Sequence, residues 1–225
     1  MISIIIPVYN EESTIRETLG NLLYNNDVEV IVVDGESNNR TLEFAKQYPV
    51  RVIKSVKNRA AQLNEGARIV KGDKFLFLHT DCRLDSGCLE KIESCLTDSF
   101  AGGCFTQKID SKKFIYRFIE TSENIRAKVS RVFYGDQAIF VRRDAFFKIG
   151  GFDKIDLFED VIFSQKLKKL GKTCVLKKKV YASARRWERQ GVIKTTLINW
   201  LISLGFFIGI SPDVLKKIYT DIREG

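Results

Sequence analysis

The sequence of 225 residues predicts an α/β fold in which helices flank a mostly parallel central sheet. Two observations predict it. Short runs of β-branched and aromatic residues recur through the first half, and segments with helical periodicity separate them. Continuous apolar runs are typical of parallel strands that are covered on both faces. Their alternation with helices indicates right-handed βαβ units and therefore a doubly wound sheet.

Four apolar runs in the first half are the expected strands, at residues 3–8, 28–34, 50–56 and 74–79. The segments between them are the expected helices, at residues 13–23, 39–48 and 60–70. In the first of these helices, apolar side chains recur on one face, as in a helix that packs on a sheet.

The alternation of strand and helix patterns is less regular after residue 85. We expect further helices at residues 86–96, 113–133 and 160–171 and further strands at residues 138–143 and 173–183. Gly171 is expected to end the last of these helices. Because no repeat or linker divides the chain, we expect a single domain over residues 1–225 that ends in an apolar helical tail, residues 191–225.

The composition is that of a folded, basic protein. Hydrophobic residues make up 44% of the chain, and the formal net charge is +9. A basic surface favours anionic partners such as nucleotides, nucleic acid or an acidic membrane. No nucleic-acid-binding motif accompanies the scattered lysines and arginines, so we expect no nucleic-acid partner.

The five cysteines show no CxxC spacing, and their number is odd. This favours small apolar residues in a reducing compartment over disulfides or a zinc site. The amino-terminal segment lacks the features of a signal peptide, and no apolar run reaches the roughly 20 residues of a membrane span. We therefore expect a cytoplasmic protein.

Polar residues follow the expected strands at their carboxyl ends, where open parallel sheets bind ligands. Together they could recognise a base, a ribose, a diphosphate and its metal. Each taken singly is also a common turn residue. They are Tyr9, Glu11, Asp34, Arg59, His79, Thr80 and Asp81.

Four stretches of the first half resemble the nucleotide-binding half of glycosyltransferase family 2. They are IIIPVYNEESTI, VIVVDGESNNRT, NRAAQLNEGA and FLFLHTDCRL. The later stretches GDQAIFVRRDAFFKIGGF, FEDVIFSQKLKKLG and ARRWERQG resemble its acceptor half, most closely in a small soluble bacterial branch with an RRWE-type segment. The resemblance implies the GT-A fold, which has a Rossmann-like sheet, and sugar transfer from a nucleotide donor with inversion. Residues 1–104 would then bind the nucleotide-sugar, and residues 105–190 the acceptor.

The resemblance also assigns residues to the donor site. Asp34 matches the aspartate that binds the base, and Arg59 an arginine near the base and phosphates. The remaining donor-site residues are Pro7, Tyr9 and Glu11, which would line the base and ribose, together with His79 and Thr80.

Asp160 matches the family's catalytic base, which would take the proton from the acceptor hydroxyl. The adjacent Glu159 would orient the site or share the catalytic role. An alternative is that both carboxylates only cap a helix, since acids favour helix N-termini.

Asp81 matches the last carboxylate of the family's metal-binding Asp-x-Asp element, which implies Mg²⁺ or Mn²⁺ as cofactor. His79 stands where the family usually has its first aspartate. It would bind the metal, contact the ribose or hydrogen-bond a loop, and these interpretations stay open.

Arg186 and Trp187 resemble the Arg-Trp pair of the family's Gln-x-x-Arg-Trp segment. Arg185 and Arg186 are candidates for binding the diphosphate, since guanidinium groups suit phosphate oxygens, and Trp187 would pack against a sugar face or close the core. Ser183 replaces the glutamine of that segment. Gln137 would meet the acceptor or the donor sugar, although a plain turn explains it equally well.

The apolar segment at residues 191–211 has three interpretations. It packs on its own domain, it pairs two subunits in a homodimer, or it lies at the membrane interface as a peripheral contact. The membrane interpretation fits a lipid-linked acceptor and a position at the inner face of the membrane, by analogy with relatives.

Two other functions are alternatives. A nucleotidyltransferase would ordinarily carry a glycine-rich phosphate loop after the first strand, and VYNEES contains no glycine. A nucleotide-binding homologue without catalytic activity is the other alternative. The presence of Asp34, Asp81 and Asp160 together argues against it.

Overall fold

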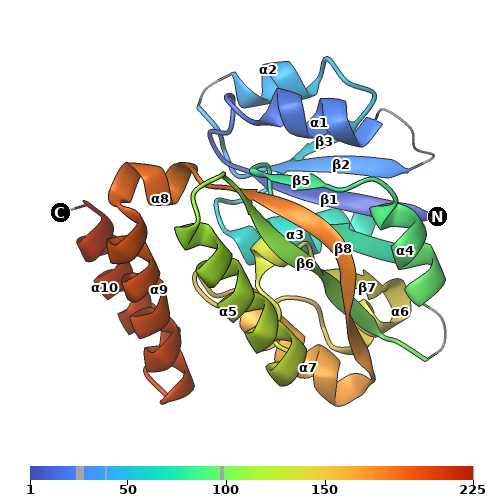
Figure 1. Ribbon diagram of the computed structural model, residues 1–225. Helices are drawn as coiled ribbons and strands as arrows, with labels where there is room; N and C mark the ends of the chain where they lie inside the picture. The colour runs from blue at the N-terminus through green and yellow to red at the C-terminus, as the bar shows by residue number, and fades with distance from the viewer. Residues whose placement is uncertain (24–27, 39, 97–98, 225) are drawn as a thin grey trace.

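The computed structural model describes residues 1–23, 28–38, 40–96 and 99–224, and it contains an eight-stranded sheet (Figure 1). The strand order is β3-β2-β1-β4-β7-β6-β8-β5. The strands are β1 (Ile2–Val8), β2 (Glu29–Asp34), β3 (Arg51–Lys54), β4 (Lys74–Phe77), β5 (Cys82–Leu84), β6 (Gly102–Asp110), β7 (Phe140–Arg142) and β8 (Thr173–Ser183).

The first four strands form a parallel half-sheet, as the sequence predicts. β1 pairs in parallel with β2 and β4, and β2 with β3. In the second half, β7 runs antiparallel to both β4 and β6, whereas β6 and β8 are parallel. The carboxyl ends of β1 to β4 therefore lie together at one edge of the sheet.

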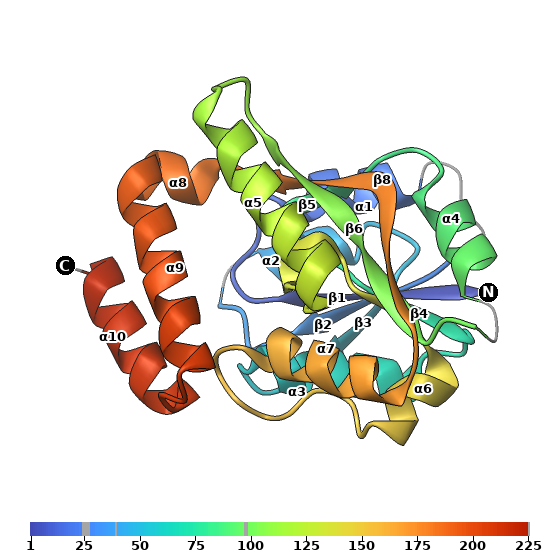
Figure 2. The ribbon, with the colours of Figure 1, turned by 60° about the horizontal axis from the view of Figure 1, so that its bottom comes forward.

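Helices cover both faces of the sheet (Figures 1 and 2). They are α1 (Ile15–Leu23), α2 (Thr41–Ala45), α3 (Arg59–Ile69), α4 (Cys88–Cys95), α5 (Ile115–Ser130), the 3-10 turn η1 (Gly135–Gln137), α6 (Arg143–Lys148), α7 (Glu159–Leu170), α8 (Arg185–Gln190), α9 (Val192–Phe207) and α10 (Pro212–Glu224). Alternate residues of β1 point to opposite faces. Ile4 and Ile6 join the core under α1 and α4, and Ile5 joins the core under α3 and α7.

Each expected strand and helix forms, and the ends differ by a few residues. The last expected strand is found at Thr173–Ser183 as predicted, and α7 ends at Leu170, directly before Gly171. Two strands were not predicted. β5 is short, and β6 begins with Gly102 and Gly103, which weaken strand propensity. A Cβ at Gly103 would collide with the backbone of Cys174, so the close pairing of β6 with β8 requires glycine there.

The tail is a helical hairpin of α9 and α10 beside the carboxyl edge of the sheet (Figures 1 and 2). One side of the hairpin packs on the domain, where Ile202 and Leu215 join a core with Val132, Phe158 and Val161. A Cβ at Gly205 would lie 2.8 Å from Leu215, so glycine permits the close approach of the two helices. Among the described helices, none has the length and hydropathy that a membrane crossing requires.

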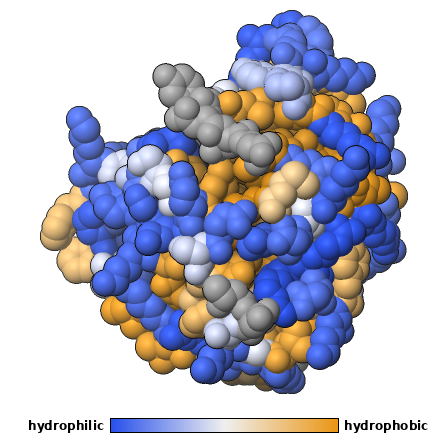
Figure 3. All heavy atoms as spheres, turned by 90° about the vertical axis from the view of Figure 1, so that its right-hand side faces the viewer, coloured by the Kyte–Doolittle hydropathy of each residue, from blue (hydrophilic) through white to orange (hydrophobic). Residues whose placement is uncertain are grey.

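The opposite end of the molecule, which carries the amino terminus and α4, mixes hydrophilic and hydrophobic residues (Figure 3). Ion pairs with at least one exposed partner lie there. The terminal amine of Met1 lies 2.8 Å from Asp73, and Lys74 lies 2.9 Å from Glu93. Such pairs contribute little to stability. The residues predicted to bind ligand lie at the other edge.

Candidate active site

The loops after β1 and β2 are tied together at the carboxyl edge of the sheet. The N–H of Asn10 donates to the Ser37 hydroxyl at 2.9 Å, and the N–H of Glu11 donates to the Thr41 hydroxyl at 2.8 Å. Asp34 is fully buried at the end of β2 and accepts the Ser37 N–H at 3.1 Å. These bonds fix the positions of Glu11 and Asp34 relative to each other.

Gln62 holds the ends of β1 and β2 in place, and the sequence analysis did not single it out. Its amide nitrogen donates to the carbonyl groups of Val8 and Val33, both at 2.8 Å. A buried amide in a helix, three residues after Arg59, is a weak signal in the sequence. Nearby, the ammonium of Lys57 lies 3.8 Å from the ring centre of Tyr9, which is 36% exposed. Pro7 is half-buried in β1.

A charged cluster forms where α3 and α7 begin. The Arg59 guanidinium lies 3.1 Å from a carboxylate oxygen of Glu159, whose side chain is only 4% exposed. Glu159 is the main cause that raises the pKa of Arg59, and Asp160 and Asp81 add to it. The cluster therefore brings together groups from the starts of two helices and the loop after β4.

Asp160 is held by two backbone N–H groups, those of Gly135 at 2.6 Å and Val161 at 2.7 Å. Gly135 also lies against His79, since a Cβ at this glycine would fall 2.6 Å from the imidazole and 3.5 Å from Asp160. Gly135 of the turn η1 therefore lies between the His79 and Asp160 side chains. A larger residue at position 135 would displace one of the two side chains.

Burial shifts both titratable groups beside Gly135. It raises the pKa of Asp160 to about 7, with a further contribution from Glu159, while hydrogen bonds and Arg59 oppose the shift. It lowers the pKa of His79 to about 4, and the charge of Arg59 adds to this. At neutral pH, the imidazole is therefore neutral, and the Asp160 carboxyl is partly protonated.

Asp136 lies beside Asp81 and was not singled out from the sequence, where only Gln137 of the Gly-Asp-Gln motif was considered. It accepts the Gln107 amide at 2.5 Å. Burial raises the pKa of Asp136 to about 6, and the charges of Glu123 and Asp81 add to the shift. Asp136 is therefore a further carboxylate of this cluster.

Asp81 is a residue of this cluster that could hold a divalent cation. Its side chain is exposed and accepts a weak contact from the Cys82 thiol at 3.7 Å. An exposed carboxylate next to a neutral imidazole offers the oxygen and nitrogen ligands that Mn²⁺ accepts, and Mg²⁺ would use the carboxylate. Over the described ranges, no group of three or more His, Cys, Asp or Glu side chains is arranged to hold a metal. A donor phosphate would have to complete the coordination.

Arg185 reaches the same edge, since its guanidinium donates to the Ser13 hydroxyl at 3.1 Å in the loop after β1. Gln137 is buried, and its carbonyl oxygen accepts the Tyr134 N–H at 3.1 Å and the Arg126 guanidinium at 3.3 Å. Thr80 is buried, and its carbonyl accepts the Thr18 hydroxyl at 2.5 Å.

Arg186 and Trp187 point elsewhere in this structure. Arg186 donates to Asn199 at 3.0 Å and to the Tyr219 hydroxyl, both in the tail. Trp187 packs edge-on against Tyr116 of α5, with ring centres 6.1 Å apart. The structure does not bring these two side chains to Asp81 and Asp160, and their roles stay predictions.

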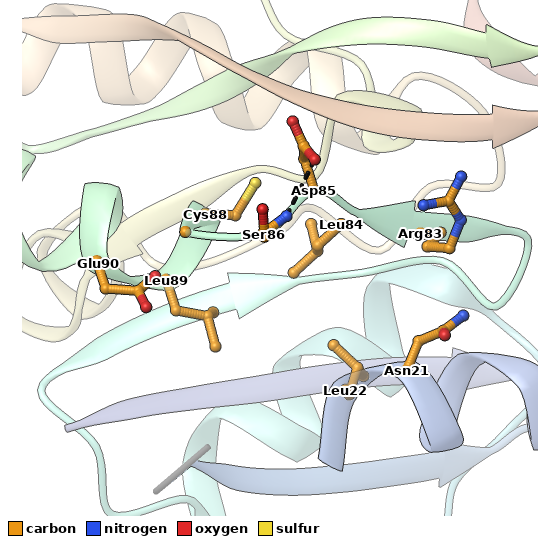
Figure 4. A pocket seen from close by; sticks show the side chains of 10 residues that line it. Asn21, Leu22, Arg83, Leu84, Asp85, Ser86, Cys88, Leu89 and Glu90 are labelled. Carbon is orange, nitrogen blue, oxygen red and sulfur yellow. Dashed lines mark hydrogen bonds between the residues drawn. The ribbon is translucent and has the colours of Figure 1, made fainter. Parts of the chain in front are cut away.

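A pocket of about 320 Å³ lies between α1, β5 and the start of α4 (Figure 4). Leu22, Leu84 and Leu89 line it together with Asp85, whose carboxylate accepts the Ser86 N–H at 3.1 Å. None of the predicted site residues lines this pocket. It is therefore separate from the charged cluster.

The fold and the charged cluster define an α/β protein with its candidate site beyond the carboxyl ends of parallel strands. The model of glycosyl transferase family 2 matches residues 3–153. The chain therefore belongs to glycosyl transferase family 2.

Two curated relatives illustrate this membership. The chain is 32% identical to an uncharacterized glycosyltransferase of Haemophilus influenzae, over 74% of this chain and 62% of the relative. It is 34% identical to a dolichol-phosphate mannosyltransferase of Pyrococcus furiosus, over 36% of this chain and 25% of the relative. The chain thus spans less than two thirds of the length of these relatives.

Solved structures confirm the predicted GT-A fold. S. aureus TarS 1–349 in complex with UDP-GlcNAc matches with a TM-score of 0.64 and 18% identity, over 81% of this chain and 58% of that chain. The mannosyltransferase PcManGT from Pyrobaculum calidifontis, in complex with GDP-Man and Mn²⁺, matches with a TM-score of 0.63 and 19% identity, over 97% of this chain and 68% of that chain. At these identities, the likeness establishes the fold alone.

Proposed function

We propose that the protein is an inverting glycosyltransferase that moves a sugar from a nucleotide-diphosphate donor to an acceptor hydroxyl. The observation that carries the proposal is Asp160, a carboxylate whose pKa is raised to about 7 and which shares Arg59 with Asp81. A base with a pKa near the working pH is well matched to proton transfer from a hydroxyl. A single displacement with such a base inverts the anomeric centre.

Residues at different positions along this edge have different roles in the proposed reaction. Asp34, Glu11, Pro7 and Tyr9 line the β1 and β2 end of the edge, where the base and ribose would bind. Asp160 takes the acceptor proton. A divalent cation, when bound, neutralises the negative charge of the leaving diphosphate.

Asp81 would hold that cation, with His79 as the second candidate ligand. The fit rests on the exposed Asp81 carboxylate and on the lowered His79 pKa, which keeps the imidazole neutral. The Mn²⁺ named with PcManGT supports a divalent cation as cofactor. Arg59 and Arg185 are the guanidinium groups placed to meet phosphates at this edge.

Glu159 would orient the site rather than accept the proton. Its carboxylate is buried and engaged with Arg59, whereas Asp160 is partly exposed. Because Glu159 also raises the pKa of Asp160, it tunes the base through its charge. Gln137, Arg186 and Trp187 remain proposed contacts of the diphosphate or acceptor.

A peripheral contact with the cytoplasmic membrane surface is the second part of the proposal. The α9 face, defined as Ile193, Leu197, Trp200, Leu201, Leu204 and Ile208, is 49% to 70% exposed at every position. The sequence of α9 contains Lys194 and no acidic residue. An apolar face with an exposed tryptophan and a nearby cation suits an anionic bilayer interface, and hence a lipid-linked acceptor.

A test separates donor binding from transfer. Calorimetry with nucleoside diphosphates and Mn²⁺ or Mg²⁺ should show that Asp81→Ala removes the metal-dependent part of the affinity. Asp160→Asn should keep that affinity and lower transfer by about 10² to 10⁴-fold, because a positioned base contributes that much. Glu65→Gln, in an exposed ion pair with Arg68, is the matched control.

Two results would contradict the proposal. Unchanged metal-dependent affinity in Asp81→Ala would remove the metal assignment, and normal transfer in Asp160→Asn would remove the base. Incorporation of a nucleotide into the product would point instead to a nucleotidyltransferase. Donor binding without transfer to any acceptor hydroxyl would point to a non-catalytic homologue.

A further inference from the structure

Two cysteines far apart in the sequence meet at the surface of the domain. Cys95 is the last residue of α4, and Cys174 lies near the start of β8. Their sulfur atoms are 2.6 Å apart, although 79 positions separate them in the chain. This distance is only about 0.6 Å longer than a disulfide bond of roughly 2.05 Å.

The other three cysteines behave as the small buried residues that the sequence predicts. Cys82, Cys88 and Cys104 are at most 2% exposed. Burial raises the pKa of all three thiols, that of Cys88 to about 12. Because the thiolate is the reactive form, these three groups are inert.

Cys95 and Cys174 differ from them in both exposure and chemistry. Both are half-buried, so a small oxidant can reach them. Either thiol can donate to the other sulfur across this contact. The contact lowers the pKa of Cys95, so that a thiolate is available within the pair.

We infer that Cys95 and Cys174 are a redox-modification site and form a reversible disulfide that joins α4 to β8. Glutathione disulfide is a sufficient oxidant. One cysteine of the pair attacks it as the thiolate, forms a mixed disulfide and releases one glutathione thiolate. The other cysteine loses its proton, attacks the protein sulfur of the mixed disulfide and releases the second glutathione thiolate. The two cysteines lose two electrons and two protons, and the oxidant becomes two thiols.

The bond would stabilise the fold without touching the candidate active site. Cys174 pairs with Gly103 at the start of β8, whereas Ser183 at the other end of this strand donates its N–H to the Asp81 carbonyl at 2.9 Å. Nine residues of strand, with an irregularity after Leu176, separate the two ends by at most about 30 Å. Cross-linking residues this distant in sequence mainly constrains the unfolded chain.

The experiment compares the full chain after incubation with reduced and with oxidised glutathione. We expect the titratable thiols in denaturant to fall from five to three, and non-reducing peptide mapping to recover the Cys95–Cys174 pair. The melting temperature should rise by roughly 5–10 °C and return after reduction. Cys95→Ser and Cys174→Ser should lose the oxidant-dependent rise, and Cys88→Ser, the matched control, should keep it.

Three results would overturn the inference. The first is that five thiols remain after oxidation of the wild-type protein. The second is a mapped bond that joins Cys104 to Cys174 or links two chains, and the third is a bond that forms without raising the melting temperature. Because the wild-type protein supplies these readouts, they do not depend on the folding of any variant.

Discussion

Asp160 lies at the first turn of α7, where two backbone N–H groups and Arg59 oppose the effect of burial on its charge. Burial and Glu159 prevail, so the carboxyl has a pKa of about 7. Neighbouring Glu159 is buried more deeply, yet Arg59 neutralises it directly. Of these two adjacent carboxylates, Glu159 forms an ion pair and Asp160 has a raised pKa, because their neighbours differ.

The raised pKa predicts how stability depends on pH. A carboxyl whose folded pKa lies above its unfolded value near 3.8 stabilises the fold at low pH, and this contribution is lost as the pH rises through about 7. Asp160→Asn removes the titration. Relative to the wild type, the variant should gain about 2–3 kcal/mol in the free energy of unfolding between pH 5 and pH 8, measured by denaturant titration.

Asp144→Asn is the control for this experiment. The Arg142 guanidinium holds the pKa of Asp144 below its usual value, so neither group titrates between pH 5 and pH 8. Its difference from the wild type should be the same at both pH values. A pH-independent difference for Asp160→Asn as well would mean that this carboxyl is ionised throughout the range.

At the scale of the elements, two glycines inside helices show why packing outweighs propensity. Gly20 lies on the exposed side of α1, where an added Cβ would meet only the Tyr48 hydroxyl, 4.0 Å away. Gly66 lies on the side of α3 that packs on the sheet. There, the Cβ would fall 2.6 Å from Ile5 and 3.0 Å from Val33.

Alanine at these two positions should therefore have opposite effects. Gly20→Ala should raise the free energy of unfolding by about 0.5–1 kcal/mol, because alanine is the better helix former. Gly66→Ala should lower it by about 1–2 kcal/mol, because overpacking a dense core costs more than the helix gains. Thermal and denaturant unfolding measure both, and stabilisation by both would contradict the described packing of α3.

At the scale of the whole molecule, the α9–α10 hairpin has one covered side and one open side. The core around Phe158 covers the first, and the α9 face remains exposed. A continuous exposed apolar face on a helix is typical of an interaction site. The hairpin lies beside the carboxyl edge (Figure 2). Val161, next to Asp160, packs against Ile202 and Leu215 of the hairpin, so a membrane bound there would bring its lipids toward the candidate site.

The membrane proposal predicts that the protein floats with anionic vesicles and only weakly with neutral ones. Binding should weaken with salt, because the basic surface contributes through a screened attraction. The variant Leu197→Glu with Leu201→Glu should lose binding several-fold. Val129→Glu, at a 79% exposed position of α5, should keep it.

Equal loss in both variants would contradict the assignment to the α9 face. Absence of flotation, together with a dimer in light scattering that Leu197→Glu with Leu201→Glu dissociates, would show that a second copy covers the face instead. The homodimer would then replace the membrane as the partner of the tail.

The sequence by itself determined the parallel half of the sheet, its flanking helices and the edge that carries the polar residues. These features follow from hydrophobic periodicity, which is local. The predicted positions of Asp34, Arg59, His79 and Asp81 at strand ends needed nothing more, and the family resemblance added Asp160.

Only the tertiary structure decided what depends on contacts between distant residues. A segment that begins with two glycines forms β6, and Asp136 lies beside Asp81. Arg186 points toward the tail, and Cys95 contacts Cys174. Local secondary-structure propensity does not predict these contacts, and at β6 it argues against the strand that forms. Their conformations are stabilised by partners that lie far away along the chain and near only after packing.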